Sequence, residues 1–325
     1  MKDALSQIKD LIHAHRSFVI LSHIRPDGDA YGTSLAFALV LQAMGKSVKV
    51  YSQEGLSRNY LFLPGKELIE RTPSFAPPDD TAIIAVDTST KERLGDSFAA
   101  WNRVPDLNLD HHASNPAYGK INVIDSESPA SSQVLYELIE ALDYPCPPEA
   151  AVNLYVGLMT DTGSFRFRQT TARTFEVAAD LVTLGADPAS AAQHCFQSSS
   201  VERFNLQREV LGVSRFALGN RIAYYHLTRE LYAKTGAQSD EVENFLELLQ
   251  TVTTVEVAFM LEDIDAGVTR VSLRSRGKVD VNAIAGKFGG GGHRLAAGIR
   301  SKIPAPELEQ KLLAEIEAAL LPFTA

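Results

Sequence analysis

Cysteine is scarce in this sequence: its 325 residues include only two, Cys146 and Cys195. They lie far apart and neither belongs to a CxxC or CxxH pattern, which excludes a disulfide-stapled scaffold and a thiolate zinc site. Such a chain fits a reducing compartment, and we expect it in the cytoplasm.

Positive charge is also in short supply, with 31 Lys and Arg against 40 Asp and Glu and a formal net charge of -9. Long duplex nucleic acid calls for a broad basic surface, so it is excluded as the expected partner. Apolar runs such as FVIL and AIIAV are far too short to cross a bilayer. The N-terminal MKDALSQIKDLIHAH has helical spacing with acids where a signal peptide needs an apolar segment. We therefore expect no membrane partner, and any phosphate chemistry should involve small substrates.

The first part of the chain has the pattern of an α/β domain. Residues 18–52 read as strand, helix (TSLAFALVLQAMGK) and strand, while TAIIAVDTS and VPDLNLD predict two further strands. SPASSQVLYELIEAL, PEAAVNLYVGLMTDTGSF and TARTFEVAADLVTLGADP predict helices. These elements favour a mostly parallel, Rossmann-like sheet in a domain over residues 1–188. Because the carboxyl ends of parallel strands meet at one edge of the sheet, ligands are expected at that edge.

The remainder predicts a helical linker and a smaller α/β domain. Residues 189–218 are polar with a serine run, and we expect a helical linker there. In residues 219–325, RIAYYHL, TVEVAFMLED and TRVSLRSR alternate like strands, while DEVENFLELLQ, DVNAIAGKF and ELEQKLLAEIEAAL have helical spacing. A mixed sheet is the expected result.

The stretch LSHIRPDGDAYGT follows the first strand and precedes the first helix of that βαβ unit. Its His23, Asp27 and Asp29 lie in one turn-forming loop, where two carboxylates so close together can face a cation. The alternative is a polar loop in which Asp29 or Thr33 caps the next helix. The loop by itself leaves both interpretations open.

Two single aspartates end apolar segments. Asp87 follows the buried run AIIAV, where a carboxylate is costly unless it is paired, hydrogen-bonded or bound to a metal; the alternative is an N-cap. Asp161, in GLMTDTGSF, reads by itself as a helix-end turn. Taken together with the other acid and histidine clusters at element ends of the same domain, both favour a functional site.

The stretch LNLDHHASN places Asp110, His111 and His112 side by side after a strand. In extended backbone, adjacent side chains point to opposite sides, so one histidine can ligate a metal while the other faces a substrate. Asp110 can orient an imidazole as a carboxylate does behind a metal ligand. The alternative is a structural histidine, which the consecutive triplet makes less favourable.

In the second domain, FGGGGHRLAAG and VSLRSRG suggest a phosphate-binding element. The glycines, including Gly290, Gly291 and Gly292, let backbone N–H groups approach an anion. His293, Arg274 and Arg276 supply donors for charge-assisted hydrogen bonds to phosphate. The alternative is a flexible glycine hinge with solvated arginines.

With SHIRPDGDAYG, VDTS, DHHASN and TDTGSF in this order, the chain resembles the DHH phosphoesterase family. FGGGGHRLAAG and SLRSRG resemble its smaller DHH-associated domain, so the resemblance covers essentially the whole length. Size and the glycine-rich segment are most similar to the members that degrade short RNA and dephosphorylate 3'-phosphoadenosine 5'-phosphate. Exonucleases of the RecJ type share the motifs but are usually longer.

The resemblance implies a pair of Mn2+ ions, although the ligand set does not exclude Mg2+, Fe2+ or Co2+. By family analogy His23 and Asp27 hold one ion, Asp29, His111 and Asp161 hold the other, and Asp87 bridges both. His112 then contacts the scissile phosphate and Asp110 fixes the histidines. Arg274, Arg276 and His293 hold the terminal phosphate or nearby backbone of the substrate.

By analogy with the family alone, the expected activity is metal-dependent hydrolysis of RNA of about two to five nucleotides to mononucleotides. The same analogy implies hydrolysis of phosphoadenosine phosphate to AMP. One alternative is a phosphodiesterase for cyclic or linear signalling dinucleotides. An alternative of another class is a nucleotide-binding module without catalysis. The sequence leaves open whether the chain forms a homodimer.

Overall fold

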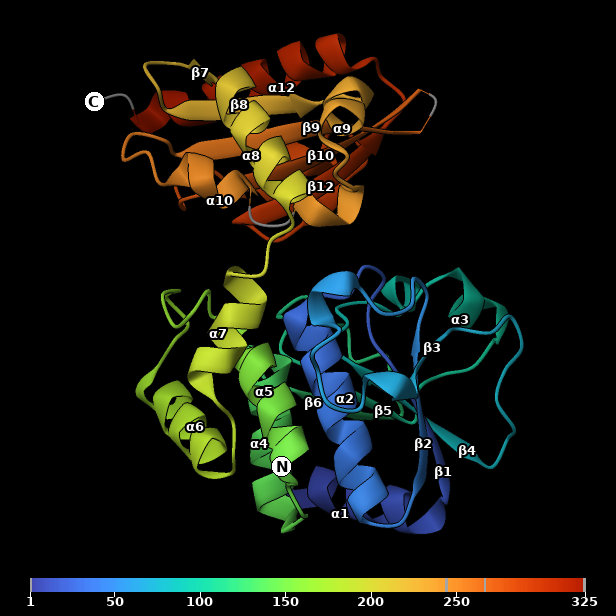
Figure 1. The fold of residues 1–325 in the computed structure, drawn as a ribbon. Helices are drawn as coiled ribbons and strands as arrows, with labels where there is room; N and C mark the ends of the chain where they lie inside the picture. The colour runs from blue at the N-terminus through green and yellow to red at the C-terminus, as the bar shows by residue number, and fades with distance from the viewer. Residues whose placement is uncertain (1, 243–244, 266, 324–325) are drawn as a thin grey trace. The chain divides into compact units, whose positions relative to one another are not determined.

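The structure is a computed structural model that describes residues 2–242, 245–265 and 267–323. The chain divides into two compact units, Met1–Ser198 and Ser199–Ala325 (Figure 1). The boundary falls inside the predicted linker, which holds two helices. Helix α7 (Pro188–Phe196) belongs to the first unit, and α8 (Val201–Val213) belongs to the second.

The first unit is built on six parallel strands in the order β3-β2-β1-β4-β5-β6. They are β1 (Ser17–Leu21), β2 (Ser47–Ser52), β3 (Ile69–Arg71), β4 (Thr81–Val86), β5 (Leu107–Asp110) and β6 (Ile121–Ile124). The chain runs outward from β1 in one direction and from β4 in the other, which is the Rossmann order, so the predicted fold class is confirmed. The sequence did not predict β3 and β6, because both are short and neither is fully buried.

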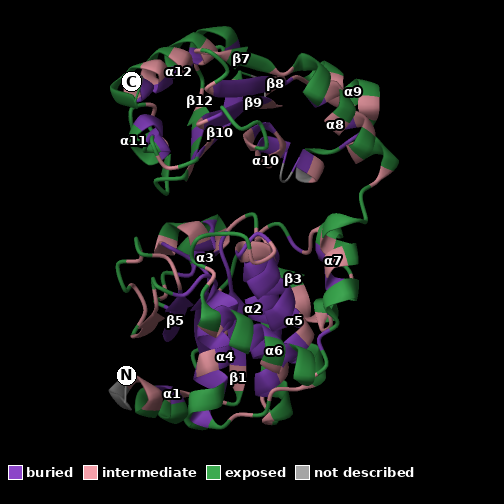
Figure 2. Cartoon of the chain, turned by 90° about the vertical axis from the view of Figure 1, so that its left-hand side faces the viewer, coloured by how far each residue is buried: buried purple, intermediate pink, exposed green. Residues whose placement is uncertain are grey.

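The helices of this unit are α1 (Lys2–Ala14), α2 (Gly28–Ala43), α3 (Asp96–Ala100), α4 (Ser131–Leu142), α5 (Pro148–Asp161), α6 (Ala172–Thr183) and α7. One face of the sheet, with Phe18, Ile84 and Leu109, packs in a large core with α1, α2, α4 and α5. The other face forms a smaller core with Phe98 of α3 and with Trp101. Almost all of α2 is buried, as Figure 2 shows in purple. Helix α2, which is buried on nearly all sides, is thus the helix that directly follows the loop with His23 and Asp27.

Helices α2 and α5 approach each other so closely that only glycine fits at two contacts. A Cβ on Gly32 would lie 2.5 Å from the carbonyl oxygen of Asn153, and a Cβ on Gly157 would lie 2.7 Å from Asp29 Oδ1. Backbone cannot move aside cheaply in a packed core. This close packing draws Asp29 of α2 towards the helix that ends in Asp161.

The second unit contains a mixed sheet in the order β11-β12-β10-β9-β8-β7, with β8 and β9 parallel and the other pairs antiparallel. Its strands are β7 (Arg215–Ala217), β8 (Ile222–Leu227), β9 (Val257–Asp265), β10 (Val268–Ser275), β11 (Gly291–Gly292) and β12 (Ala296–Ser301). Its helices after α8 are α9 (Arg229–Thr235), α10 (Phe245–Gln250), α11 (Val281–Gly286) and α12 (Ala305–Leu320). Helices α11 and α12 cover one face, and α8 and α10 cover part of the other.

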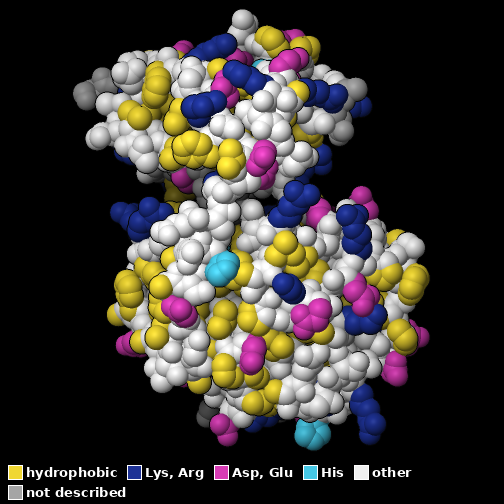
Figure 3. Space-filling view, viewed as in Figure 1, with side chains coloured by type: hydrophobic (Ala, Val, Ile, Leu, Met, Phe, Trp, Pro, Cys, Tyr) yellow, Lys and Arg dark blue, Asp and Glu magenta, His cyan; other side chains and the backbone are white. Residues whose placement is uncertain are grey.

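Most predicted elements are present with shifted ends. The helix expected from Thr33 begins at Gly28, because Asp27 caps it. The helix expected over residues 240–250 is a short 3-10 turn (Ser239–Val242) followed by α10, and residues 243–244 lie outside the described residues. No helix in the described part of the chain has both the length and the apolar character that a bilayer crossing requires. On the face shown in Figure 3, acidic and basic side chains are interspersed.

Candidate metal centre

The predicted site residues of the first unit meet at the carboxyl edge of its sheet. His23 and Asp27 follow β1, Asp87 follows β4, and the Asp110–His112 triplet ends β5. Strands β1 and β4 are neighbours, and the chain leaves them in opposite directions. This is the topological switch point, where open α/β sheets bind ligands.

Asp27 caps α2 and also faces the site. Its Oδ1 accepts hydrogen bonds from the backbone N–H groups of Asp29 and Ala30, each at 3.1 Å. Its Oδ2 lies 3.7 Å from His23 Nε2. The sequence interpretation that named Asp29 or Thr33 as the capping residue was wrong, because the helix already begins at Gly28 and Asp27 is its N-cap. Capping and cation binding are compatible here, since each uses a different oxygen.

Replacing Asp27 separates these two contributions. Asparagine caps helices as well as aspartate does, whereas alanine does not. We expect Asp27→Ala to be less stable than Asp27→Asn by about 1 kcal/mol, and both variants to bind Mn2+ about tenfold or more weakly than the wild type, as ligand-sphere changes do. Chemical unfolding of metal-free protein and equilibrium dialysis of Mn2+ measure the two effects.

Asp187→Ala, which removes the side-chain cap of α7, is the control: it should lose stability and keep Mn2+ binding. Full Mn2+ affinity in Asp27→Asn would contradict the assignment.

Asp29 is fully buried and caps a different helix. Its Oδ2 accepts the backbone N–H of Ser131 at 2.6 Å, and its Oδ1 accepts that of Ser132 at 3.0 Å and the hydroxyl of Thr33 at 3.1 Å. Helix α4 has no capping side chain of its own at Ala130. A carboxylate at a helix N-terminus is favourable, so α4 holds Asp29 in place.

Asp87 lies between two histidines. Its Oδ2 is 3.6 Å from His23 Nε2, and its Oδ1 is 3.5 Å from His111 Nε2. The Ser131 hydroxyl donates to Oδ1 at 2.9 Å. Asp87 has a left-handed backbone, with φ of 50°, and Thr90 rather than Asp87 precedes the next 3-10 turn. The N-cap interpretation of Asp87 was therefore wrong.

The two histidines of the triplet have different partners. His111 Nδ1 lies 3.3 Å from the carbonyl oxygen of Ser128, and its Nε2 lies 3.2 Å from Asp161 Oδ2. His112 Nδ1 lies 2.7 Å from Asp110 Oδ1. Asp110 thus orients His112, while the Ser128 carbonyl orients His111; the expectation that Asp110 fixes both histidines is met only for one.

Proton affinities in the centre are strongly shifted. Burial alone would lower the pKa of His23, but Asp27 and Asp87 outweigh it and raise this pKa to about 10. Burial, together with the charge of Asp87, raises the pKa of Asp29 to about 7. Burial next to Asp29 also raises the pKa of Asp161, whose side chain keeps 30 % of its surface exposed. The metal-free centre therefore retains protons that a cation would replace.

The geometry fits divalent cations. Three groups each bring potential ligand atoms within 4.8 Å of one another: His23 with Asp27 and Asp87, Asp29 with His111 and Asp161, and Asp87 with His111 and His112. Carboxylate and imidazole donors suit Mn2+, Mg2+, Fe2+ or Co2+ rather than a soft ion. Asp87 and His111 each occur in two groups, which is the arrangement expected for neighbouring cations.

The glycine-rich segment and Arg274 lie at one end of the second sheet. Arg274 pairs with Ala296 across β10 and β12, and β11 is formed by Gly291 and Gly292. A Cβ on Gly290 would lie 2.2 Å from the carbonyl oxygen of Gly298, so the backbone approach needs glycine there. The turn after β11 closes with a hydrogen bond of 2.6 Å from His293 N–H to the Ala296 carbonyl.

Both arginines of the predicted phosphate-binding element have partners in the protein. Arg274 Nε donates to Glu247 Oε1 at 3.1 Å. Arg276 donates to the backbone carbonyls of Thr253, at 2.9 Å, and Gln250. A phosphate would therefore compete with Glu247 for Arg274.

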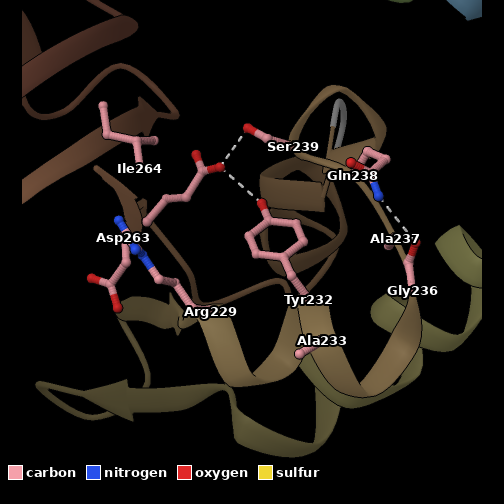
Figure 4. Close-up of a pocket in the computed structure, with 10 residues that line it drawn as sticks. Arg229, Tyr232, Ala233, Gly236, Ala237, Gln238, Ser239, Asp263 and Ile264 are labelled. Carbon is pink, nitrogen blue, oxygen red and sulfur yellow. Dashed lines mark hydrogen bonds between the residues drawn. The ribbon is translucent and has the colours of Figure 1, made fainter. Parts of the chain in front are cut away.

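A separate cavity of about 470 Å³ in the second unit contains none of the predicted site residues. Its buried Glu262 accepts hydrogen bonds from Tyr232, at 2.8 Å, and Ser239, at 2.6 Å (Figure 4). Arg270 pairs with the other oxygen of Glu262. The carboxylate is thus paired with side chains of the protein itself, so the metal centre in the first unit remains the better candidate for chemistry.

Two family models and two curated relatives match most of the chain. The model of the DHH family, N-terminal domain, matches residues 17–159, and that of the DHHA1 domain matches residues 220–321. The chain is 34% identical over 284 residues to the bifunctional oligoribonuclease and PAP phosphatase NrnA of Thermus thermophilus, covering 87% of this chain and 83% of that one. It is 25% identical over 319 residues to the protein of the same name from Bacillus subtilis, covering 94% and 95%.

Solved structures share the fold. An exopolyphosphatase-related protein from Bacteroides fragilis has a TM-score of 0.88 at 24% identity, covering 98% of both chains. RecJ from Thermus thermophilus, solved with Mn2+, has a TM-score of 0.56 at 15% identity, covering 96% of this chain and 54% of that one.

A Rossmann-like sheet with an Asp- and His-lined centre at its switch point, joined to a mixed-sheet unit, defines a metal-site hydrolase of two α/β domains. The chain belongs to the DHH phosphoesterase family with a C-terminal DHHA1 domain and is homologous to NrnA.

The sequence did not assign three groups that position the centre. Ser131 reaches Asp87 through its hydroxyl, Ser128 holds His111 through its carbonyl, and Asn115 donates to Asp110 Oδ2 at 2.6 Å. Asn115 is the last residue of the stretch LNLDHHASN, and this closeness to Asp110 was the only sequence feature that could have indicated its role. Both serines lie in the first turn of the predicted helix SPASSQVLYELIEAL, and nothing in that pattern shows which side chains they meet.

Proposed function

We propose that the protein is a Mn2+-dependent phosphodiesterase that hydrolyses RNA of a few nucleotides to mononucleotides and removes the 3'-phosphate of phosphoadenosine phosphate. The observation that carries this proposal is the set of three overlapping Asp and His groups at the switch point. The homology to NrnA supplies the substrate class. Mg2+ or Co2+ in place of Mn2+, and a cytoplasmic location, stay predictions.

In this proposal His23, Asp27, Asp29, Asp87, His111 and Asp161 hold two cations. When bound, such cations provide an activated water at neutral pH and screen the charge of the phosphate. His112, held by Asp110 at 2.7 Å, presents its Nε2 to the substrate and can pass a proton to the leaving oxygen. Arg274, Arg276, His293 and the glycines Gly290, Gly291 and Gly292 bind the phosphate or backbone of the far nucleotide.

Hydrolysis of a labelled RNA dinucleotide by metal-stripped protein, with and without added Mn2+, tests the proposal. We expect mononucleotides only with Mn2+, and release of phosphate from phosphoadenosine phosphate under the same conditions. An intact dinucleotide in both samples would overturn the proposed substrate.

A parallel assay distinguishes the other activities. Faster turnover of a cyclic dinucleotide than of the linear one would replace the proposal by a signalling phosphodiesterase. Tight nucleotide binding without turnover of any of these substrates would favour a binding module. Sedimentation of the same preparation reports whether the chain is a homodimer.

A further inference from the structure

Arg93 lies beside the metal centre although no sequence motif points to it. It belongs to the 3-10 turn Lys91–Leu94, which comes after Asp87 and β4. Its carbonyl oxygen accepts the backbone N–H of Ile24 at 2.7 Å, which ties this turn to the loop after β1. Its guanidinium nitrogen Nη2 lies 3.2 Å from His23 Nδ1. A permanent positive charge is thus fixed at the back of a proposed cation ligand.

Within the described residues, Arg93 forms no ion pair, whereas Arg103 and Arg173 of the same unit do. Arg173 pairs with three glutamates, and Arg103 pairs with Asp79 at 3.0 Å. The centre next to Arg93 holds several carboxylates, yet they face the histidines rather than the guanidinium. Arg93 therefore keeps donors that match an incoming anion, and a guanidinium binds phosphate oxygens in a planar fork.

The contact between Arg93 and His23 is not compatible with cation binding by His23. Nδ1 also lies 2.8 Å from the carbonyl oxygen of Ile24. A single ring nitrogen cannot donate to that carbonyl and accept from Arg93 at the same time. For Nε2 to bind a cation it must carry no hydrogen, so the neutral ring places its hydrogen on Nδ1, which then donates to Ile24. In that state the guanidinium has no acceptor at Nδ1 and is available to another one.

We propose that Arg93 binds a non-bridging oxygen of the scissile phosphate and is a substrate-binding residue of the first unit. The inference rests on the proposed function and extends it, since the arginines of the glycine-rich unit are separate from this one. The phosphate that lies at the cations supplies the acceptor that Arg93 lacks at His23 Nδ1. Turnover then depends on Arg93, while Mn2+ binding does not.

The experiment compares wild type, Arg93→Gln, Arg93→Lys and the control Arg103→Gln, an arginine of the same unit that pairs with Asp79. Calorimetric titration of AMP into each Mn2+-saturated protein is the first readout. We expect the dissociation constant of AMP to rise about 10- to 100-fold in Arg93→Gln, because the variant loses one or two charge-assisted hydrogen bonds to the phosphate. Arg93→Lys should recover part of the loss, Arg103→Gln should match the wild type, and the affinity for Mn2+ should be unchanged in all four.

Turnover of the RNA dinucleotide is the second readout, with an expected fall in kcat/KM of about 100-fold or more in Arg93→Gln, as for other donors to a reacting phosphate or oxyanion. If Arg93 only holds the His23 ring, Arg93→Gln will bind Mn2+ more weakly and keep normal AMP affinity once saturated, which overturns the inference. If wild-type protein neither binds AMP nor cleaves the dinucleotide, the proposed function fails as a whole. Normal AMP binding by both wild type and Arg93→Gln refutes the role of Arg93 alone.

Discussion

Replacing Asp87 by asparagine is expected to lower the turnover number for an RNA dinucleotide by about 10⁴-fold, roughly 5.5 kcal/mol. Asp87 lies within 3.6 Å of both His23 and His111, so the two proposed cation sites depend on its charge. Asparagine keeps the size of the side chain and tolerates the left-handed backbone, with φ of 50°, that Asp87 adopts. The variant therefore tests the charge rather than the fold. Dialysis against Mn2+ should show fewer than two bound ions per chain.

Two other variants show whether this loss is specific. Asp106→Asn changes another buried aspartate of the first unit, which accepts the backbone N–H of Ile83 at 2.8 Å and pairs with Lys120 away from the centre. It should keep its turnover number. Arg274→Ala should mainly raise KM, because Arg274 is proposed to bind the far end of the substrate. Equal losses of turnover at saturating substrate in Asp87→Asn and Arg274→Ala would contradict these roles.

Metal-free protein is expected to lose stability as the pH rises from 6 to 8.5, with a fall in melting temperature of about 10 °C for a few kcal/mol in a unit of this size. The folded-state pKa of Asp29 is raised from 3.8 to about 7, and that of His23 is raised from 6.5 to about 10. A raised pKa means that the folded state holds more protons than the unfolded chain, so its contribution to stability falls as pH rises. Asp29 loses this contribution between about pH 4 and 7, and His23 loses it between about 6.5 and 10.

Added Mn2+ should oppose this trend. Its binding needs unprotonated ligands, so the rise in melting temperature that Mn2+ produces should grow with pH. Trp101 is the only tryptophan in the sequence and is buried in the first unit, so its fluorescence reports unfolding of the unit that holds the centre. His23→Asn should flatten the metal-free profile above pH 6.5, the ordinary pKa of the lost imidazole. A metal-free protein that gains stability with pH would refute the proton-holding centre.

The sequence by itself determined the residue types of the centre and their place in the fold. His23 and Asp87 come after the apolar runs FVIL and AIIAV, and Asp110 ends the alternating segment LNLD. Such strand-like segments are local patterns that burial imposes. Parallel strands bring the residues at their carboxyl ends to one edge of the sheet, so the meeting of these side chains could be predicted without knowing any contact. The family motifs in their order added the proposed cation ligands and the proposed substrate class.

Only the tertiary structure decided which groups hold one another. Asp29 accepts the N–H of Ser131, a residue 102 positions later, and Arg93 reaches His23 from the loop after a different strand. Short segments with weak periodicity were also beyond the sequence, as β11 shows, since Gly291 and Gly292 pair only because β12 lies beside them. Hydrogen bonds between distant segments depend on how helices and strands pack, and local side-chain spacing does not record that packing. The sequence therefore determined which side chains are available to the centre. The tertiary packing determined the orientation and the hydrogen-bond partners of each imidazole and carboxylate.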